Sequence, residues 1–133
     1  MPVIDKEHVV ELILEACPSF EDEWKQHRAE YGDDLLYVAA GSLARHLLVL
    51  HKCNRQDCFP ALGAVIERLH TEGSPWVKEF ATIGILESVQ NVWMNEGADP
   101  EDFCRWLGPE SRKWWSNVND FWSGKAPYVG GQG

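Results

Sequence analysis

Prolines and glycines divide this chain into short segments, and this punctuation constrains the fold more than any other feature of the sequence. Proline interrupts a helix when it lies in the interior, and glycine commonly follows a helix end. Between these stops apolar residues recur at helical spacing, and no stretch alternates apolar and polar residues for long enough to predict a strand. We therefore expect an all-α protein, a compact bundle of about six to seven helices. The predicted helical segments are residues 5–16, 19–31, 35–53, 57–71, 74–95, 99–107 and 109–123.

The helix ends carry their own signals. Ser19 is the expected N-cap of the second segment and Gly32 its stop, while Ser74 and Pro75 form a favourable start for the fifth. Gly84 lies inside that fifth segment, where glycine costs about 1 kcal/mol relative to alanine. We therefore expect a packing reason at Gly84, namely a second helix whose backbone approaches closely.

The polarity of the segments predicts how they are arranged. Residues 35–53 are apolar on nearly every side, which is typical of the central helix of a bundle. Residues 57–71 and 74–95 are joined by a short turn and are expected to form an antiparallel pair, similar to a HEAT-type helical pair. Because the 133 residues show no clear repeat period, the pattern favours an irregular bundle over a solenoid.

The length fits one domain, which we place at residues 1–124, with residues 125–133 as a flexible C-terminal tail. No apolar run is long enough to span a bilayer, and the N-terminus has acids where a signal peptide carries cations. We therefore expect no export by that route. Thiols normally stay reduced in a chain without a secretion signal, so we interpret the four cysteines as free thiols, mostly in the core.

Negative charge is concentrated at the N-terminal end. Residues 1–34 contain ten acids and three bases, within a chain whose net charge is −9. Such a surface repels nucleic acid phosphates and anionic membranes and attracts basic protein surfaces. We therefore predict a basic protein partner, no nucleic acid and no membrane. The residues expected to bind this partner are Glu21, Glu23, Trp24, Glu30, Tyr31, Asp33 and Asp34, with Trp24 or Tyr31 as the apolar anchor.

Several groups of residues have the side chains that metal sites use. Glu23, His27 and Glu30 fall on one helical face, where they form either a divalent metal site or a solvated acidic surface. A zinc site would draw on two histidines and two cysteines, but there is no Cys-x-x-Cys motif and the two histidines diverge around the helix axis. We favour the solvated surface, no metal and no cofactor. The zinc candidates are His46, His51, Cys53 and Cys58.

Catalytic motifs are equally weak. Glu67 and His70 form one Glu-x-x-His pair, whereas a ferritin-like di-metal site needs that pair twice. A cysteine nucleophile needs a histidine held beside its thiol, and spacing alone does not show such a pairing. Phosphate-binding glycine motifs are absent from the sequence. We therefore expect no catalytic residues and a protein that is not an enzyme.

Four stretches of the chain carry a family resemblance. They are CPSFEDEW (17–24), EYGDDLLYV (30–38), TIGILESVQN (82–91) and LGPESRKWWSNVNDFW (107–122), and together they resemble a family of uncharacterised short bacterial all-α proteins. The most specific is the L-G-P-E-S-R-x-W-W pattern, which runs from Leu107 to Trp115. The resemblance implies a bacterial, cytoplasmic domain and brings no known activity with it.

The residues of that last motif also have a physical interpretation. Gly108 closes one helix and Pro109 opens the next, so the motif predicts a structural corner. Glu110 then lies near the positive end of the helix dipole. A functional pair of Glu110 and Arg112 is the alternative interpretation.

Two functional hypotheses follow. The first is an acidic protein-binding domain, most concretely an immunity- or antitoxin-type inhibitor of a basic protein such as a toxin nuclease, in which carboxylates occupy positions otherwise taken by phosphates. The second is a small helical adaptor or HEAT-like scaffold without an inhibitory role, whose binding surface is the pair of segments 57–71 and 74–95. The first predicts affinity that falls with ionic strength and the second does not. The sequence leaves the oligomeric state open.

Overall fold

The computed structural model describes residues 3–33 and 35–122, and of residues 120–122 it describes the backbone. The predicted all-α class is confirmed, because these residues contain one isolated β-bridge and no strand. α5, η2 and α6 follow one another without a break, and counting them as one rod gives seven helices besides a short 3-10 turn. The elements are α1 (Lys6–Ala16), η1 (Pro18–Phe20), α2 (Glu21–Tyr31), α3 (Leu36–Lys52), α4 (Phe59–Glu72), α5 (Pro75–Glu79), η2 (Phe80–Leu86), α6 (Glu87–Asn95), α7 (Glu101–Cys104) and α8 (Pro109–Trp122).

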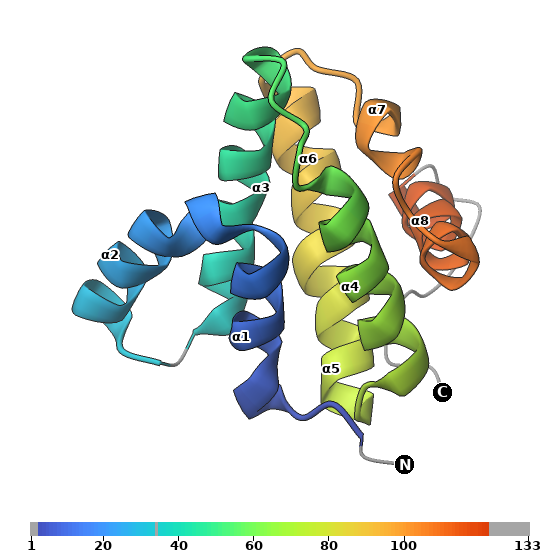
Figure 1. Cartoon of the computed structure of the whole chain (residues 1–133). Coiled ribbons are helices and arrows are strands. Elements are labelled where there is room, and N and C mark those ends of the chain that lie inside the picture. The colour runs from blue at the N-terminus through green and yellow to red at the C-terminus, as the bar shows by residue number, and fades with distance from the viewer. Residues whose placement is uncertain (1–2, 34, 123–133) are drawn as a thin grey trace.

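α3 lies at the centre of the bundle, as its sequence predicts. It packs against α6 and η2, and Figure 1 shows it standing between α2 and α6. Leu43 and Leu47 are buried on this side, and the carbonyl of Ala44 accepts a hydrogen bond from Trp93 Nε1 at 3.2 Å. The outer side of α3 is apolar as well, because Val49 is 57% exposed.

α4 and the rod of residues 75–95 form the predicted antiparallel pair, and Figure 1 shows them side by side. The turn between them is fixed by local hydrogen bonds. Ser74 Oγ accepts from the backbone N–H of Val77 at 3.3 Å, which confirms Ser74 as an N-cap. The backbone of Ile4 also holds this turn, since its N–H donates to Glu72 O and its carbonyl accepts from Ser74 N, both at 2.9 Å.

The middle of this rod is not an α-helix, so the prediction of one uninterrupted α-helix is wrong. η2 is a π-helical segment, a form that appears where one extra residue is accommodated within a helix. A Cβ at Gly84 would lie 2.7 Å from the ring of Phe80, and that ring is stacked on Trp76 with centroids 5.2 Å apart. Gly84 therefore makes room for an aromatic ring of its own rod, and the expected close approach of a second helix backbone at this residue stays a prediction.

α1 and α2 cover one side of the bundle, α1 against α4 and α2 against α3 (Figure 1). The turn between them differs from the prediction. Pro18 starts the 3-10 turn η1, so α2 begins at Glu21 and its N-cap position is occupied by Phe20. Ser19 is therefore not the N-cap of α2, and its hydroxyl lies 2.8 Å from His46 Nε2 instead.

The corner between α7 and α8 is held by a carboxylate from α4. Glu67 accepts hydrogen bonds from Glu110 N at 3.1 Å, from Ser111 N at 2.9 Å and from Ser111 Oγ at 2.9 Å. These backbone N–H groups have no partner within their own helix, so Glu67 serves as the cap of α8. A Cβ at Gly108 would lie 2.6 Å from the carboxyl carbon of Glu67, which explains why glycine precedes Pro109.

The predicted tail of residues 125–133, like Ser123 at the end of the seventh predicted segment, lies outside the described residues. Among the helices that are described, none has the length and apolar character needed to cross a membrane.

Candidate functional site

The predicted binding residues of α2 lie on two sides of that helix. Trp24 and Asp33 face α1, whereas Glu23, Glu30 and Tyr31 face α3. Glu21 is exposed in the first turn of α2, 3.5 Å from Lys25 Nζ. Asp34 lies outside the described residues.

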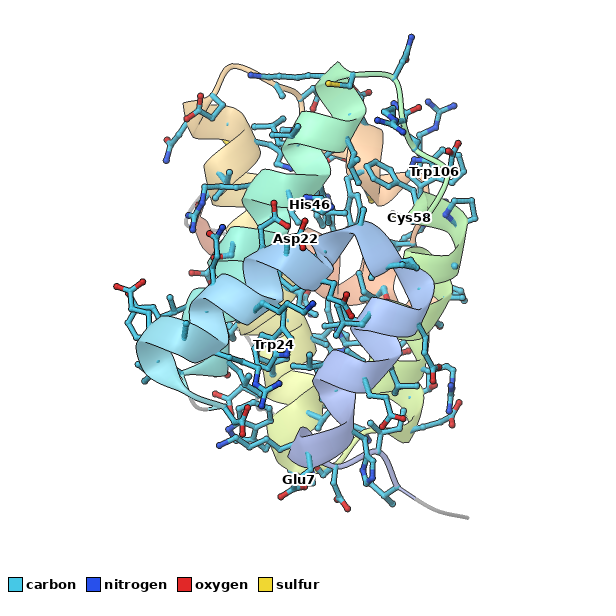
Figure 2. All side chains as sticks on the ribbon, turned by 60° about the vertical axis from the view of Figure 1, so that its left-hand side comes forward. Glu7, Asp22, Trp24, His46, Cys58 and Trp106 are labelled. Atoms are coloured by element: carbon cyan, nitrogen blue, oxygen red, sulfur yellow. The ribbon has the colours of Figure 1, made fainter. Side chains whose placement is uncertain are left out.

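A groove of about 760 Å³ runs between α1 and α2, and we call it the α1–α2 groove. Its floor is apolar and consists of Val10, Leu14, Trp24 and Leu36. Its rim contains four carboxylates and two bases, namely Glu7, Glu11, Glu15, Asp33, Lys6 and Arg28. The groove thus combines an apolar floor with an acidic rim. In Figure 2 Glu7 marks the start of α1 and Trp24 lies between α1 and α2.

Trp24 forms the floor of this groove and is not an exposed anchor. It is 8% exposed and stacks on the ring of His27, with centroids 5.2 Å apart. His27 in turn contacts the ring of Tyr31 at 5.1 Å, and Tyr31 is 40% exposed. Of the two predicted anchors, Tyr31 therefore presents the larger surface to a partner.

A second depression of about 390 Å³, the α2–α3 hollow, lies on the other side of α2. It brings together Glu23, His27 and Glu30, the three residues considered as metal ligands. His27 is 4% exposed and lies between two aromatic rings. No group of three or more His, Cys, Asp or Glu side chains among residues 3–33 and 35–122 is arranged to hold a metal ion.

Exposed apolar side chains gather at the turn between α2 and α3. Leu35, Tyr37 and Val38 are 55%, 40% and 42% exposed, and Tyr31 lies at the end of α2. Tyr31 and Val38 line the α2–α3 hollow together, whereas the ring of Tyr37 lies edge-on to Trp76 and Phe80. Leu35 has a left-handed backbone, with φ 57°, a conformation that costs roughly 1 kcal/mol or more for a residue other than glycine. This set, which we call the α2–α3 apolar cluster, extends the acidic surface with apolar contact area.

Sequence reasoning missed the contribution of α1 to this surface. Glu7, Glu11 and Glu15 are exposed and line one rim of the groove. Their spacing of four residues places them on one helical face, so the signal was present in the sequence. What the sequence did not show is that this face lies opposite α2.

The zinc candidates are dispersed. His46 contacts Ser19 and Glu23, whereas His51 stacks on Trp93 with centroids 4.9 Å apart and lies 3.4 Å from Asp102. The two histidines thus point to different neighbours, as their spacing predicts. Cys53 is exposed at the end of α3, while Cys58 contacts Cys17.

Glu67 and His70 belong to a buried network that resembles a hydrolase triad only in composition. Ser111 Oγ lies 2.9 Å from His70 Nδ1, and Thr82 Oγ1 lies 3.0 Å from His70 Nε2. Ser111 is fully buried, and Glu67 binds Ser111 and not the histidine. Burial lowers the pKa of His70 to about 4, so this imidazole is neutral at pH 7. The network therefore joins α4, η2 and α8 inside the fold.

The alternative pair in the last motif is not formed. Arg112 Nη2 donates to the carbonyl of Arg105 at 2.9 Å, and Glu110 lies 3.8 Å from Lys113 Nζ. Both contacts belong to the corner between α7 and α8. Of the adjacent tryptophans in the motif, Trp115 is buried and Trp114 half-buried.

Comparison with curated proteins and with solved structures found no match. A scan against family models found one for a domain of unknown function, DUF7674, which matches residues 10–123. The matched region extends from α1 to the end of α8 and includes most of the α1–α2 groove. The chain therefore belongs to the DUF7674 family.

Proposed function

We propose that this protein is an acidic protein-binding domain that engages a basic protein through the α1–α2 groove. The observation that carries the proposal is the apolar floor beneath a carboxylate rim. Lysine and arginine side chains have apolar stems and cationic heads, so both parts find a matching surface in such a groove. Complementary charge also accelerates the encounter of the two proteins.

The distribution of exposed apolar side chains also supports a binding surface on the side of the molecule formed by α1 and α2. Four of the seven large apolar side chains that are exposed among the described residues form the α2–α3 apolar cluster, next to the acidic helix α2. Of the other three, Met94 lies on α6, in the rod that pairs with α4, and none lies on α4 or α5. Aromatic side chains are favoured at the centres of protein interfaces, and Tyr31 and Tyr37 are the candidates here.

In its most concrete form, the proposal is an immunity- or antitoxin-type inhibitor of a basic toxin such as a nuclease. Carboxylates on the rim would then occupy the positions that phosphates take in the toxin's substrate. The family resemblance adds a bacterial, cytoplasmic setting to the proposal. We assign the L-G-P-E-S-R-x-W-W motif to the fold, because Glu67 accepts hydrogen bonds from the backbone of its glutamate and serine at the corner of α8.

The second candidate remains a helical adaptor that binds through the pair formed by α4 and the rod of residues 75–95. The observation in its favour is the antiparallel packing of these helices beside each other. Met94, 67% exposed on α6, would be an apolar contact on this surface, and the affinity would not depend on the acidic rim.

Charge reversal in the groove tests the first candidate. The protein is immobilised and exposed at low salt to lysate of its own source, and bound proteins are identified by mass. We expect the wild type to retain a basic protein and a variant with Glu11→Lys and Asp33→Lys to lose it. Both acids are exposed, so folding should be unaffected, and circular dichroism checks this.

A matched control changes the same amount of charge elsewhere. Asp57 and Glu96 are exposed acids outside both depressions, so Asp57→Lys with Glu96→Lys should retain the partner. Retention by the groove variant would contradict the proposal. An equal loss in both variants would show that net charge matters and the groove does not.

A further inference from the structure

Two cysteines that are 41 residues apart in sequence lie against each other in the fold. The Sγ atoms of Cys17 and Cys58 are 3.0 Å apart, with the Cys58 thiol donating to Cys17, and both are free thiols. Cys17 follows the last residue of α1, and Cys58 precedes the first residue of α4. Figure 2 shows Cys58 at the start of α4, beside the turn that joins α1 and α2.

A chain of polar side chains leads away from this pair. Ser19 Oγ lies 3.6 Å from Cys17 Sγ and 2.8 Å from His46 Nε2. His46 Nδ1 lies 3.5 Å from Glu23 Oε1 on the far side of the ring. A thiol, a hydroxyl and an imidazole oriented by a carboxylate thus form a continuous path, which is the arrangement that carries a proton away from a reacting sulfur.

The two thiols differ in pKa and in exposure to solvent. The pKa of Cys17 falls to about 6, because the Cys58 thiol donates to its sulfur and, against the opposing effect of burial, Ser19 and His46 add to the stabilisation of the thiolate. As the donor of that hydrogen bond, Cys58 has its pKa raised. Cys17 is therefore the more acidic of the two thiols, and Cys58 is the proton donor between them. Cys17 is fully buried, whereas Cys58 is partly exposed.

We propose that Cys17 and Cys58 form a thiol–disulfide exchange site for low-molecular-weight disulfides of the glutathione type. Cys58, the exposed sulfur, meets the incoming disulfide, and Cys17 completes an internal disulfide. Sulfur atoms in a disulfide are about 2.05 Å apart, so the present contact needs a movement of only about 1 Å.

The chemistry balances without another reagent. The Cys58 sulfur attacks one sulfur of the incoming disulfide, and the Cys58 proton passes to the Cys17 thiolate. The bond between the two sulfurs of the incoming disulfide breaks, and the first thiolate product leaves. Cys17 then releases that proton through Ser19 to His46 and attacks the Cys58 sulfur, which expels the second product as a thiolate. The pair of cysteines is oxidised by two electrons, and the incoming disulfide is reduced to two thiolates. Each thiolate becomes a thiol by taking up a proton, one returned by His46 and one supplied by water.

The test uses the purified full-length protein in glutathione buffers stepped from reducing to oxidising. Intact mass and peptide mapping follow each cysteine. We expect a Cys17–Cys58 disulfide that forms and reverses with the buffer, while exposed Cys53 carries only bound glutathione. Reduced Cys17 and Cys58 in a buffer that fully glutathionylates Cys53 would overturn the proposal, and this readout needs no variant.

Two variants test the assigned roles. In Cys17→Ser the mixed disulfide on Cys58 should persist, because its resolving sulfur is gone. His46→Gln keeps a hydrogen-bonding partner for Ser19 but removes the proton acceptor, so closure of the internal disulfide should slow by at least about tenfold. Cys53→Ser is the matched control and should exchange at the wild-type rate. Wild-type closure in His46→Gln would refute the assigned proton path, and a mixed disulfide on Cys58 that is lost as fast in Cys17→Ser as in the wild type would refute the resolving role of Cys17.

Discussion

Substitution by alanine should change the stability of the protein in opposite directions at two glycines in helix interiors. Gly63 lies in α4, and a Cβ there would run into the backbone carbonyl oxygen of Trp106, with the carbonyl carbon at 3.0 Å. Gly41 lies in α3, and a Cβ there would meet only the end of the Arg45 side chain, at 3.7 Å. The same substitution is therefore crowded at one site and accommodated at the other.

The magnitudes follow from helix propensity and packing. Alanine is favoured over glycine in a helix interior by up to about 1 kcal/mol, and Gly41→Ala should gain most of this. At Gly63 that gain is outweighed, because a backbone carbonyl does not rotate away as a side chain does, and overpacking costs about 1–3 kcal/mol or more. Moving the Trp106 backbone also disturbs the ring contact between Phe59 and Trp106. We expect Gly63→Ala to lower the free energy of unfolding by about 1–2 kcal/mol.

Urea unfolding followed by tryptophan fluorescence measures both variants against the wild type. The predicted result is a lower midpoint for Gly63→Ala and a slightly higher one for Gly41→Ala, with unchanged slopes. If Gly63→Ala were as stable as Gly41→Ala, the close approach of the Trp106 backbone, in the turn after α7, to α4 would be refuted.

Two further predictions concern the buried network at the corner of α8. Glu67→Ala leaves Glu110 N and Ser111 N without their acceptor and should lower the free energy of unfolding by about 2–4 kcal/mol. The control Glu72→Ala, on the same helix, loses an exposed ion pair and should lower it by less than about 1 kcal/mol. Equal losses in urea unfolding would contradict the capping role of Glu67. Burial lowers the pKa of His70 from 6.5 to about 4, so between these two pH values the unfolded chain binds a proton that the folded protein does not. The contribution of neutral His70 to the free energy of unfolding is therefore fully present above pH 6.5 and falls by about 3 kcal/mol as the pH is lowered from 6.5 to 4. Stability measured against pH should therefore fall in this window for the wild type, and an equally steep fall in His70→Gln would argue against this assignment.

Helix boundaries were predictable because their causes are local. Ser74 and Pro75 start α5 through contacts within a few residues, and Gly32 ends α2 with a positive φ of 75°. Ser19 was assigned wrongly, because Pro18 starts a 3-10 turn before the α-helix and leaves the serine hydroxyl for His46. The N-cap prediction for Ser19 failed because its hydroxyl can bind either a nearby backbone N–H or a residue that is distant in sequence.

The π-helical segment and the cap of α8 were not predictable, since both depend on contacts between distant parts of the fold. The ring of Phe80 lies over Gly84 while it stacks on Trp76. The cap of α8 comes from Glu67, 44 residues before Ser111 in the sequence. A sequence pattern shows that glycine and proline form a corner at residues 108–109, but not which carboxylate holds it.

For the candidate site, the sequence identified the acidic helix but not the shape of the surface. The acids of α2 were recognised from charge density alone. The groove exists because α1 lies beside α2, so that Glu11, Trp24 and Asp33 line one groove. The Cys17–Cys58 contact likewise depends on packing between α1 and α4 and has no signature in the spacing of the two residues.

The dependence of partner affinity on ionic strength tests the proposed function most directly. The basic protein captured at low salt is titrated against the wild type at about 0.1 M and about 1 M salt, where the Debye length falls from about 10 Å to about 3 Å. If the acidic rim recognises this partner, affinity should fall by at least about tenfold at high salt, and Glu11→Lys with Asp33→Lys should already be weak at low salt. Equal affinity at both salt concentrations would contradict recognition by the α1–α2 groove and would favour the adaptor.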